Sequence, residues 1–165
     1  MGNNCIIAEQ EGILMKDTDE LKRILQNTHI ENVGEYIKNN QDSMILDDRP
    51  FTNYMHQKIK EKKMTQQDIF VNADVTERYG YKLLSEQKRT KQRDVIIRIC
   101  YAANFTLYET QKALRIYGMP ELYIKYERDA VLMICFNERP GTVIDVNNIL
   151  KKYKLDPLRT SGLQE

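Results

Sequence analysis

Helix-start signals recur along the whole of this chain, and they constrain its fold more than any other feature. In a capping box, a threonine hydroxyl accepts a hydrogen bond from the backbone three residues later, and an acidic side chain there bonds back. Apolar residues at helical spacing follow each such signal, which predicts an all-α protein. The signals are Thr28-His29-Ile30-Glu31, Thr65-Gln66-Gln67-Asp68, Thr106-Leu107-Tyr108-Glu109 and Thr142-Val143-Ile144-Asp145.

Composition excludes several broad classes of protein. The 165 residues include only seven glycines and four prolines, which disfavours a turn-rich β-sandwich. The longest apolar run, residues 130–136, is much shorter than the roughly 20 residues of a membrane helix. The three cysteines are far apart and neither histidine has ligand spacing to them, so we expect free thiols in the cytoplasm and no metal site.

Changes in pattern divide the chain into segments. Residues 42–49 are typical of a linker, and Pro50 suits the first position of a helix. Gly118 and Pro120 are typical of a helix end. We therefore expect a loose N-terminal extension (1–16), an acidic helical segment (17–49), a central domain (50–118), a C-terminal helical pair (119–155) and a tail (156–165).

Charge is distributed unevenly, although the formal net charge is only +1. Residues 1–50 carry 5 basic and 10 acidic side chains, whereas residues 51–118 carry 13 basic and 7 acidic ones. Residues 119–165 carry seven of each. The near-neutral total therefore hides a positive field over the middle of the chain. Such a field can attract a partner of opposite charge, and a solvated surface without a partner is the alternative.

Residues 65–85 form the most informative segment, because two short helices joined by a tight turn are expected there. Thr65 starts the first helix, and Thr76 can cap a second that runs to about Ser85. Gly80 destabilises a helix interior by about 1 kcal/mol relative to alanine. Its place on the inner face predicts a close approach to the preceding helix. The inner face also holds Tyr79, for which core packing is expected.

Residues 51–118 resemble the Xre-type, lambda-repressor-like helix-turn-helix family. The segments that carry the resemblance are residues 64–69, 74–76, 79–84 with Lys88-Arg89, and 93–99. The resemblance implies a bundle of five short helices, here with extra helices at both ends. The order of Tyr79/Tyr81, Arg93-Asp94, Glu109-Thr110-Gln111 and Arg128-Asp129 is also similar to a bacterial subgroup from Firmicutes. The family's usual Glu-x-Gly-x-x-x-Pro stretch after the second helix is missing here.

The resemblance implies which residues would contact double-stranded DNA. Two glutamines would hold a phosphate at the start of the first helix, and the outer side of the second would read bases in the major groove. Four cations after it would clamp the flanking backbone. The implied contact residues are Gln66, Gln67, Thr76, Glu77, Arg78, Tyr81, Lys82, Lys88, Arg89, Lys91 and Arg93.

The sequence therefore predicts a sequence-specific transcriptional regulator, acting as a homodimer because one such module reads only a few base pairs. The alternative is a non-enzymatic adaptor that binds proteins through a degenerate helix-turn-helix bundle. A further hypothesis is autoinhibition, in which the acidic residues 17–49 lie over the basic face. We expect no enzyme and no cofactor, because nucleophile–base pairs and glycine-rich phosphate loops are missing. The sequence identifies no small-molecule effector.

Residues 122–137 are very apolar at their centre, and their length and charged flanks favour a helix over a buried strand. Such a helix must be covered. Packing under the last helix is the first expectation, and a two-fold dimer interface is the second.

Overall fold

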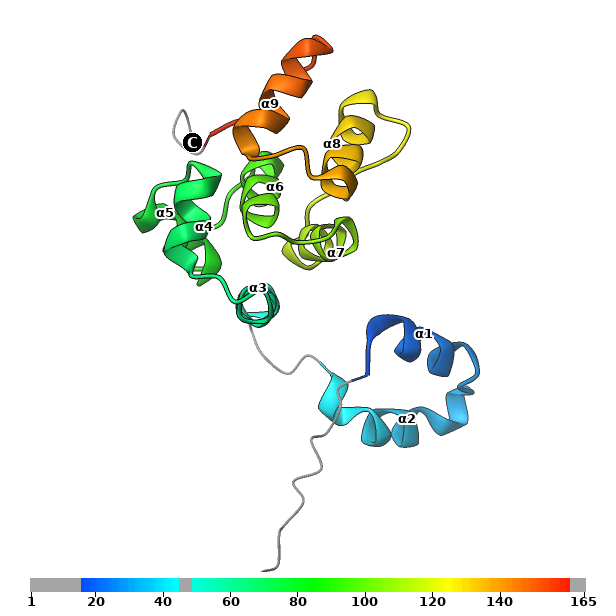
Figure 1. The fold of residues 1–165 in the computed structure, drawn as a ribbon. Helices are drawn as coiled ribbons and strands as arrows, with labels where there is room; N and C mark the ends of the chain where they lie inside the picture. Colours follow the sequence, from blue (N-terminus) through cyan, green and yellow to red (C-terminus); the bar gives the residue numbers. More distant parts are fainter. Residues whose placement is uncertain (1–15, 45–48, 161–165) are drawn as a thin grey trace, which may run out of the picture. The chain divides into compact units, whose positions relative to one another are not determined.

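The computed structural model describes residues 16–44 and 49–160, which fall into two compact units, 1–47 and 48–165. Within these described ranges the protein has nine α-helices and no strand (Figure 1), so the predicted all-α class is confirmed. Most of the predicted extension 1–16, part of the linker and the end of the tail lie outside the described residues.

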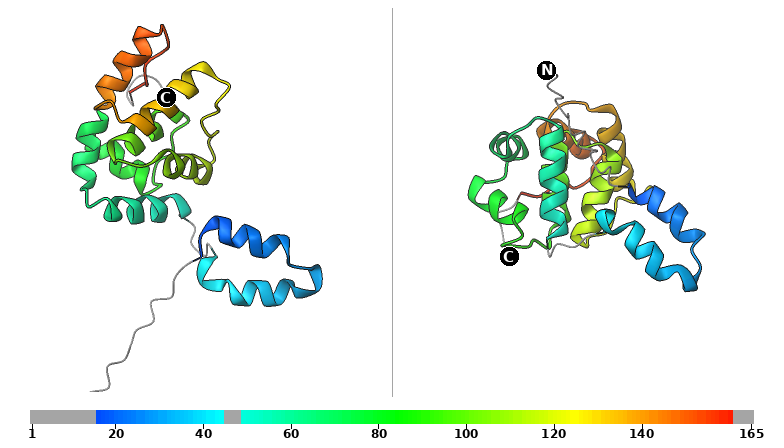
Figure 2. Two further views of the ribbon diagram at one scale, coloured as in Figure 1. Left: turned by 45° about the vertical axis from the view of Figure 1, so that its right-hand side comes forward. Right: turned by 90° about the horizontal axis from the view of Figure 1, so that it is seen from below.

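The first unit is a helical hairpin (Figure 2). It contains α1 (Thr18–Gln26) and α2 (Val33–Asn39), with the 3-10 turns η1 (Ile30–Asn32) and η2 (Gln41–Ser43). Lys16 ties the two ends together, because its ammonium donates to Asn40 Oδ1 at 2.6 Å and its backbone N–H donates to Ser43 Oγ at 2.9 Å.

The capping box predicted at Thr28 is wrong. The Thr28 hydroxyl donates back to the carbonyl of Ile24 at 2.7 Å, so it closes α1 instead of starting the next helix. His29 is the N-cap of η1 and makes no side-chain capping bond. The apolar residues that follow remain largely exposed within the described part of this unit: Ile30, Val33 and Ile37.

The second unit contains seven helices. Their bounds are α3 Pro50–Glu61, α4 Gln66–Ala73, α5 Glu77–Leu84, α6 Arg93–Ala102, α7 Leu107–Tyr117, α8 Glu127–Glu138 and α9 Val143–Lys152. Pro50 is the first residue of α3, as predicted. The threonine caps at Thr65, Thr106 and Thr142 are confirmed, and the last two form complete capping boxes. Thr76 takes the N-cap position of α5 but makes no side-chain capping bond.

Helix α6 is the centre of the second unit and packs against α4, α7 and α9. Its residues from Val95 to Tyr101 are all buried, and large side chains from α3, α4, α5 and α7 complete the core around it. Among those side chains are Phe51, Phe70, Leu83 and Leu114, all fully buried. The core therefore fixes the position of the short helices α4 and α5 relative to α6.

The helix predicted from Leu122 begins only at Glu127. Residues 119–126 form a loop instead, because the Gln111 side chain donates to the carbonyl of Leu122 at 2.8 Å and accepts from its N–H at 2.7 Å. These bonds replace the backbone pairing of a helix. Helix α8 packs against α7 and α9, and it buries Leu132 and Phe136 while Ile134 faces outward.

The predicted close approach at Gly80 is confirmed. A Cβ atom added at Gly80 would lie 2.5 Å from two ring carbons of Phe70, a fully buried residue of α4. Only a residue without a side chain lets α5 pack this closely on α4.

We expect the G80A variant to lower the free energy of unfolding by about 1–3 kcal/mol, because the added methyl group overpacks the Phe70 ring. Urea unfolding would measure the change. G34A is the matched control, since nothing lies within 4 Å of the methyl group it adds to α2. That variant should stabilise its own helix by up to about 1 kcal/mol. A G80A variant as stable as the natural chain would contradict the packing argument.

Candidate nucleic-acid interface

Two short helices and a three-residue turn form the candidate interface. Helix α4 ends at Ala73, and Asp74 follows in the left-handed conformation with φ of 53°. Asparagine and aspartate adopt this conformation more readily than most residues. Val75 is buried and anchors the turn, and Thr76 then starts α5.

Arg98 of α6 stabilises this turn through hydrogen bonds and an ion pair. Its Nε donates to the carbonyl of Ala73 at 2.8 Å, and one terminal nitrogen pairs with the Asp74 carboxylate at 3.2 Å. The other terminal nitrogen donates to the carbonyl of Leu158 at 2.8 Å. Burial lowers the pKa of the Arg98 guanidinium, while the carboxylates of Asp74 and Asp94 act in the opposite direction. One buried cation thus links the end of α4, the turn and the C-terminal segment.

The outer side of α5 faces solvent. Gly80, Leu83 and Leu84 are buried, whereas five residues expected to contact DNA are exposed: Thr76, Glu77, Arg78, Tyr81 and Lys82. The structure thus brings these five side chains together on one side of one helix. Within the described part of the chain, no ion pair engages Arg78 or Lys82.

Two contacts order this outer surface. The amide nitrogen of Gln67, in the first turn of α4, donates to Glu77 Oε1 at 3.0 Å, so the starts of the two helices are linked. The Tyr81 ring packs edge-on against Phe70 with 5.0 Å between centroids, and the tyrosine remains exposed. Gln66 is half-buried beside them.

The basic residues after α5 lie on the loop that leads to α6. Lys88, Arg89 and Lys91 are exposed there. Arg89 is nonetheless held in place: its guanidinium lies 4.4 Å from the centre of the Tyr117 ring, donates to the Tyr117 carbonyl and pairs with Glu86 at 3.2 Å. Lys88 lies over the ring of Tyr79, which is half-buried against the core.

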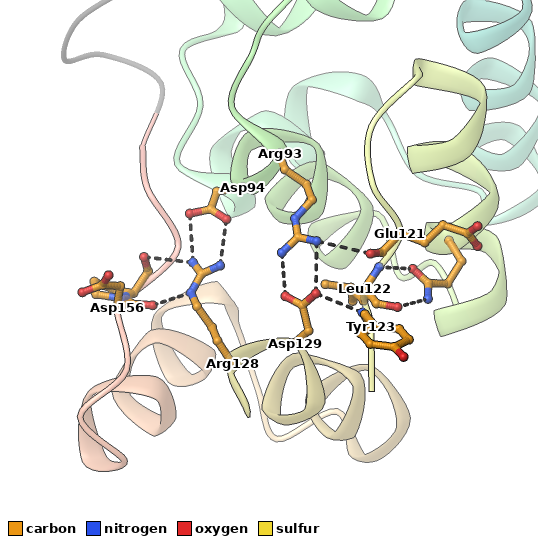
Figure 3. Close-up of polar contacts among 10 residues, drawn as sticks. Arg93, Asp94, Glu121, Leu122, Tyr123, Arg128, Asp129 and Asp156 are labelled. Atoms are coloured by element: carbon orange, nitrogen blue, oxygen red, sulfur yellow. Dashed lines mark hydrogen bonds and ion pairs between the residues drawn. The ribbon is translucent and has the colours of Figure 1, made fainter. Parts of the chain in front are cut away.

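Arg93 is held in an ion pair within the second unit. Its guanidinium makes two bonds to the Asp129 carboxylate, at 2.5 and 3.1 Å (Figure 3). The neighbouring Asp94 accepts two bonds from Arg128, at 2.9 and 3.1 Å. Each Arg-Asp dipeptide therefore pairs with the other and fastens the start of α8 to the start of α6. These two ion pairs could have been predicted from the repeated Arg-Asp dipeptide in the sequence.

A C-terminal segment bonds to the same two ion-paired residues, Arg128 and Asp94. Arg128 donates to the carbonyls of Asp156 and Pro157 at 2.8 and 3.2 Å, and the Arg159 N–H donates to Asp94 at 3.0 Å. The sequence predicted that a tail begins at Asp156, outside the packed helices. Residues 156–160 instead lie against α6 and α8, because Arg98 and Arg128 both need carbonyl acceptors.

In the described part of the chain, the thiols of Cys100 and Cys135 are buried and several acidic groups have structural partners. No group of three potential metal ligands gathers among the described residues. Burial raises the pKa of the Cys100 thiol, which disfavours the reactive thiolate. Glu109, Asp145 and the Arg-Asp dipeptides cap helices or form ion pairs.

Searches against protein-family models, curated proteins and solved structures found no match. Among the described helices, none is long and apolar enough to cross a membrane.

Proposed function

We propose that this protein is a sequence-specific DNA-binding transcriptional regulator of the Xre helix-turn-helix type. In this proposal, helices α3–α7 are the five helices of a lambda-repressor-like bundle, and α4, the turn and α5 are its DNA-reading motif. The observation that carries the proposal is the outer side of α5, where Arg78 and Lys82 are exposed with no ion pair among the described residues.

Each exposed group on α5 has a role in this proposal. Arg78 can donate two bonds to a guanine, and Glu77 can accept from a cytosine. Tyr81 can pack on a thymine methyl group, and Lys82 can reach a phosphate or a base edge. The Phe70 contact restrains the Tyr81 ring before DNA arrives, so less conformational freedom is lost on binding.

The phosphate contacts come from the flanks of the motif. Gln66 and Gln67 stand at the start of α4, where free backbone N–H groups favour an anion. Lys88, Arg89 and Lys91 would hold the backbone beyond α5. Each neutralised phosphate adds roughly 0.9 to the slope of affinity against salt on logarithmic scales, so binding should weaken steeply as salt rises. Arg93 is left out because Asp129 engages it.

We expect the double variant R78A/K82A to bind DNA at least tenfold more weakly than the natural chain, because each lost contact is worth about 1–3 kcal/mol. Fluorescence anisotropy with the upstream DNA of the protein's own gene, or with a duplex selected from a random pool, measures this. The control K151A/K152A removes the same charge from exposed positions of α9. Equal affinity of R78A/K82A and the natural chain, or affinity indifferent to salt, would exclude this interface.

A protein-binding adaptor is the second candidate, and the first unit favours it. Four large apolar side chains are exposed there among the described residues, which is unusual on a short hairpin: Leu25, Ile30, Val33 and Ile37. Capture of a protein partner, together with no DNA binding even at low salt, would favour this candidate over the first.

A further inference from the structure

A cavity of about 690 Å³ lies beside α9 in the second unit. The helix lines it with Ile144, Asn147, Asn148 and Lys151. These four residues are spaced by three or four positions, so they share one face of α9, and a different face of the helix packs into the core. Small-molecule sites commonly have volumes of about 300–1,000 Å³, so a ligand of modest size fits here.

Three other parts of the second unit complete the wall of this cavity. They are α6 with the residue that precedes it, the turn after α4, and the C-terminal segment that is red in Figure 1. They contribute Gln92, Arg98, Asp74 and residues 157–160. Arg98 donates to the carbonyl of Leu158, and the N–H of Leu158 donates to Asn147 Oδ1 at 2.8 Å. Because these bonds tie the parts of the wall together, little conformational freedom is lost when a ligand binds.

The cavity is positively charged. Arg98, Lys151 and Arg159 line it, and Asp74 is the one carboxylate among its described lining residues, so the lining carries a net charge of +2. Within residues 16–44 and 49–160, no ion pair engages Lys151 or Arg159. A phosphate monoester carries a charge of about −1.5 to −2 at neutral pH, whereas a carboxylate carries a single charge. The charge of the lining therefore favours a ligand with a phosphate group.

Gln92 indicates that the ligand is more than a bare ion. Its side-chain oxygen is shielded from solvent and has no hydrogen-bond partner among the described residues. A buried acceptor without a donor is unfavourable. Rotation of the amide about its last side-chain bond would turn this oxygen to the cavity, where a hydroxyl or amino group of a ligand can donate to it. A phosphate group held by the cations leaves this acceptor to a second part of the same ligand.

We infer that this cavity binds a small organic phosphate that carries hydroxyl or amino groups, which is the chemistry shared by sugar phosphates and nucleotides. Lys151 and Arg159 neutralise the phosphate, and Gln92 accepts a hydrogen bond from the organic part. Ile144, which is 70% exposed, offers that part an apolar contact. The inference does not depend on DNA binding, because ligand binding is measured without DNA.

Isothermal titration calorimetry of the full chain tests the inference, with ribose 5-phosphate, adenosine monophosphate and inorganic phosphate as probes. We expect at least one of the two organic phosphates to bind about tenfold or more tightly than inorganic phosphate, because only they supply the second part. Which of the two binds distinguishes a sugar phosphate from a nucleotide. No binding of either at millimolar concentration would overturn the inference. Affinity for inorganic phosphate as high as for the organic probes would overturn it too, because the cations alone would then account for binding.

Two variants locate the ligand. K151A should raise the dissociation constant of the organic phosphate about fivefold or more, because it removes a cation from the wall. K152A is the matched control, since Lys152 belongs to the same last turn of α9 and does not line the cavity. Q92M keeps the length of the side chain and should weaken binding of the organic phosphate by a similar factor. Urea unfolding verifies that the variants are folded. Natural affinity in either K151A or Q92M would overturn the inference, because the ligand would then bind elsewhere.

Discussion

Replacing Arg98 with methionine should lower the free energy of unfolding by about 2–4 kcal/mol. Methionine fills much of the same space, so the loss of stability comes mainly from the missing hydrogen bonds. The carbonyls of Ala73 and Leu158 would each lose a charged donor in a buried place, and an unsatisfied buried group costs about 1–3 kcal/mol. Urea unfolding followed by circular dichroism measures the change.

The Asp74 carboxylate provides the control for this prediction. Arg98 is 3% exposed, but its ion-pair partner Asp74 is 76% exposed, so solvent screens that pair. The D74N variant keeps a residue that tolerates the left-handed backbone and should cost less than about 1 kcal/mol. If D74N were as damaging as R98M, the ion pair rather than the two carbonyls would be the source of stability.

The helix starts could be predicted from the sequence because capping is local. Thr106 and Glu109, like Thr142 and Asp145, find each other within one turn whatever surrounds them. Thr28 shows the limit of this reasoning. Its hydroxyl had a second local acceptor, the Ile24 carbonyl, and only the folded chain shows which bond forms.

Features that depend on distant partners could not be predicted. Leu122 leaves the helical pattern because Gln111, eleven residues earlier, takes both of its backbone groups. Arg98 lies in an apolar helix, and nothing near it in the sequence indicates that its acceptors are 25 and 60 residues away. Gly80 is the exception: a glycine on the inner face of a helix itself indicates that another element lies close.

The residues of the candidate site show the same difference between local features and features that depend on distant partners. Exposure of Arg78 and Lys82 follows from the amphipathic pattern of α5, which is a property of that helix alone. Arg93 has the same charge and lies close to that helix in sequence, yet its guanidinium binds Asp129, 36 residues later. Closeness in sequence to the proposed DNA-reading helix therefore does not distinguish a proposed DNA contact from a structural cation.

The R93M variant should lower the free energy of unfolding by about 3–5 kcal/mol, because it leaves a buried carboxylate without its cation. The Asp129 side chain is 3% exposed and would keep the Tyr123 N–H as a hydrogen-bond donor from its own loop. Chemical denaturation of the full chain measures the loss. The double variant R93M/D129L should recover much of it, since replacing a whole buried pair by apolar residues is often neutral.

Arg115 and Glu121 offer a matched comparison for this last experiment. They form an ion pair at 2.8 Å, but both side chains are exposed, so R115M should cost less than about 1 kcal/mol. The contrast between R93M and R115M isolates burial as the cause, because both variants remove an arginine that binds a carboxylate. Similar losses in the two variants would mean that the ion pairs between α6 and α8 contribute no more to stability than a surface ion pair. In that case Gln111, which bonds to both backbone groups of Leu122, would contribute more to holding the loop 119–126 than Arg93 does.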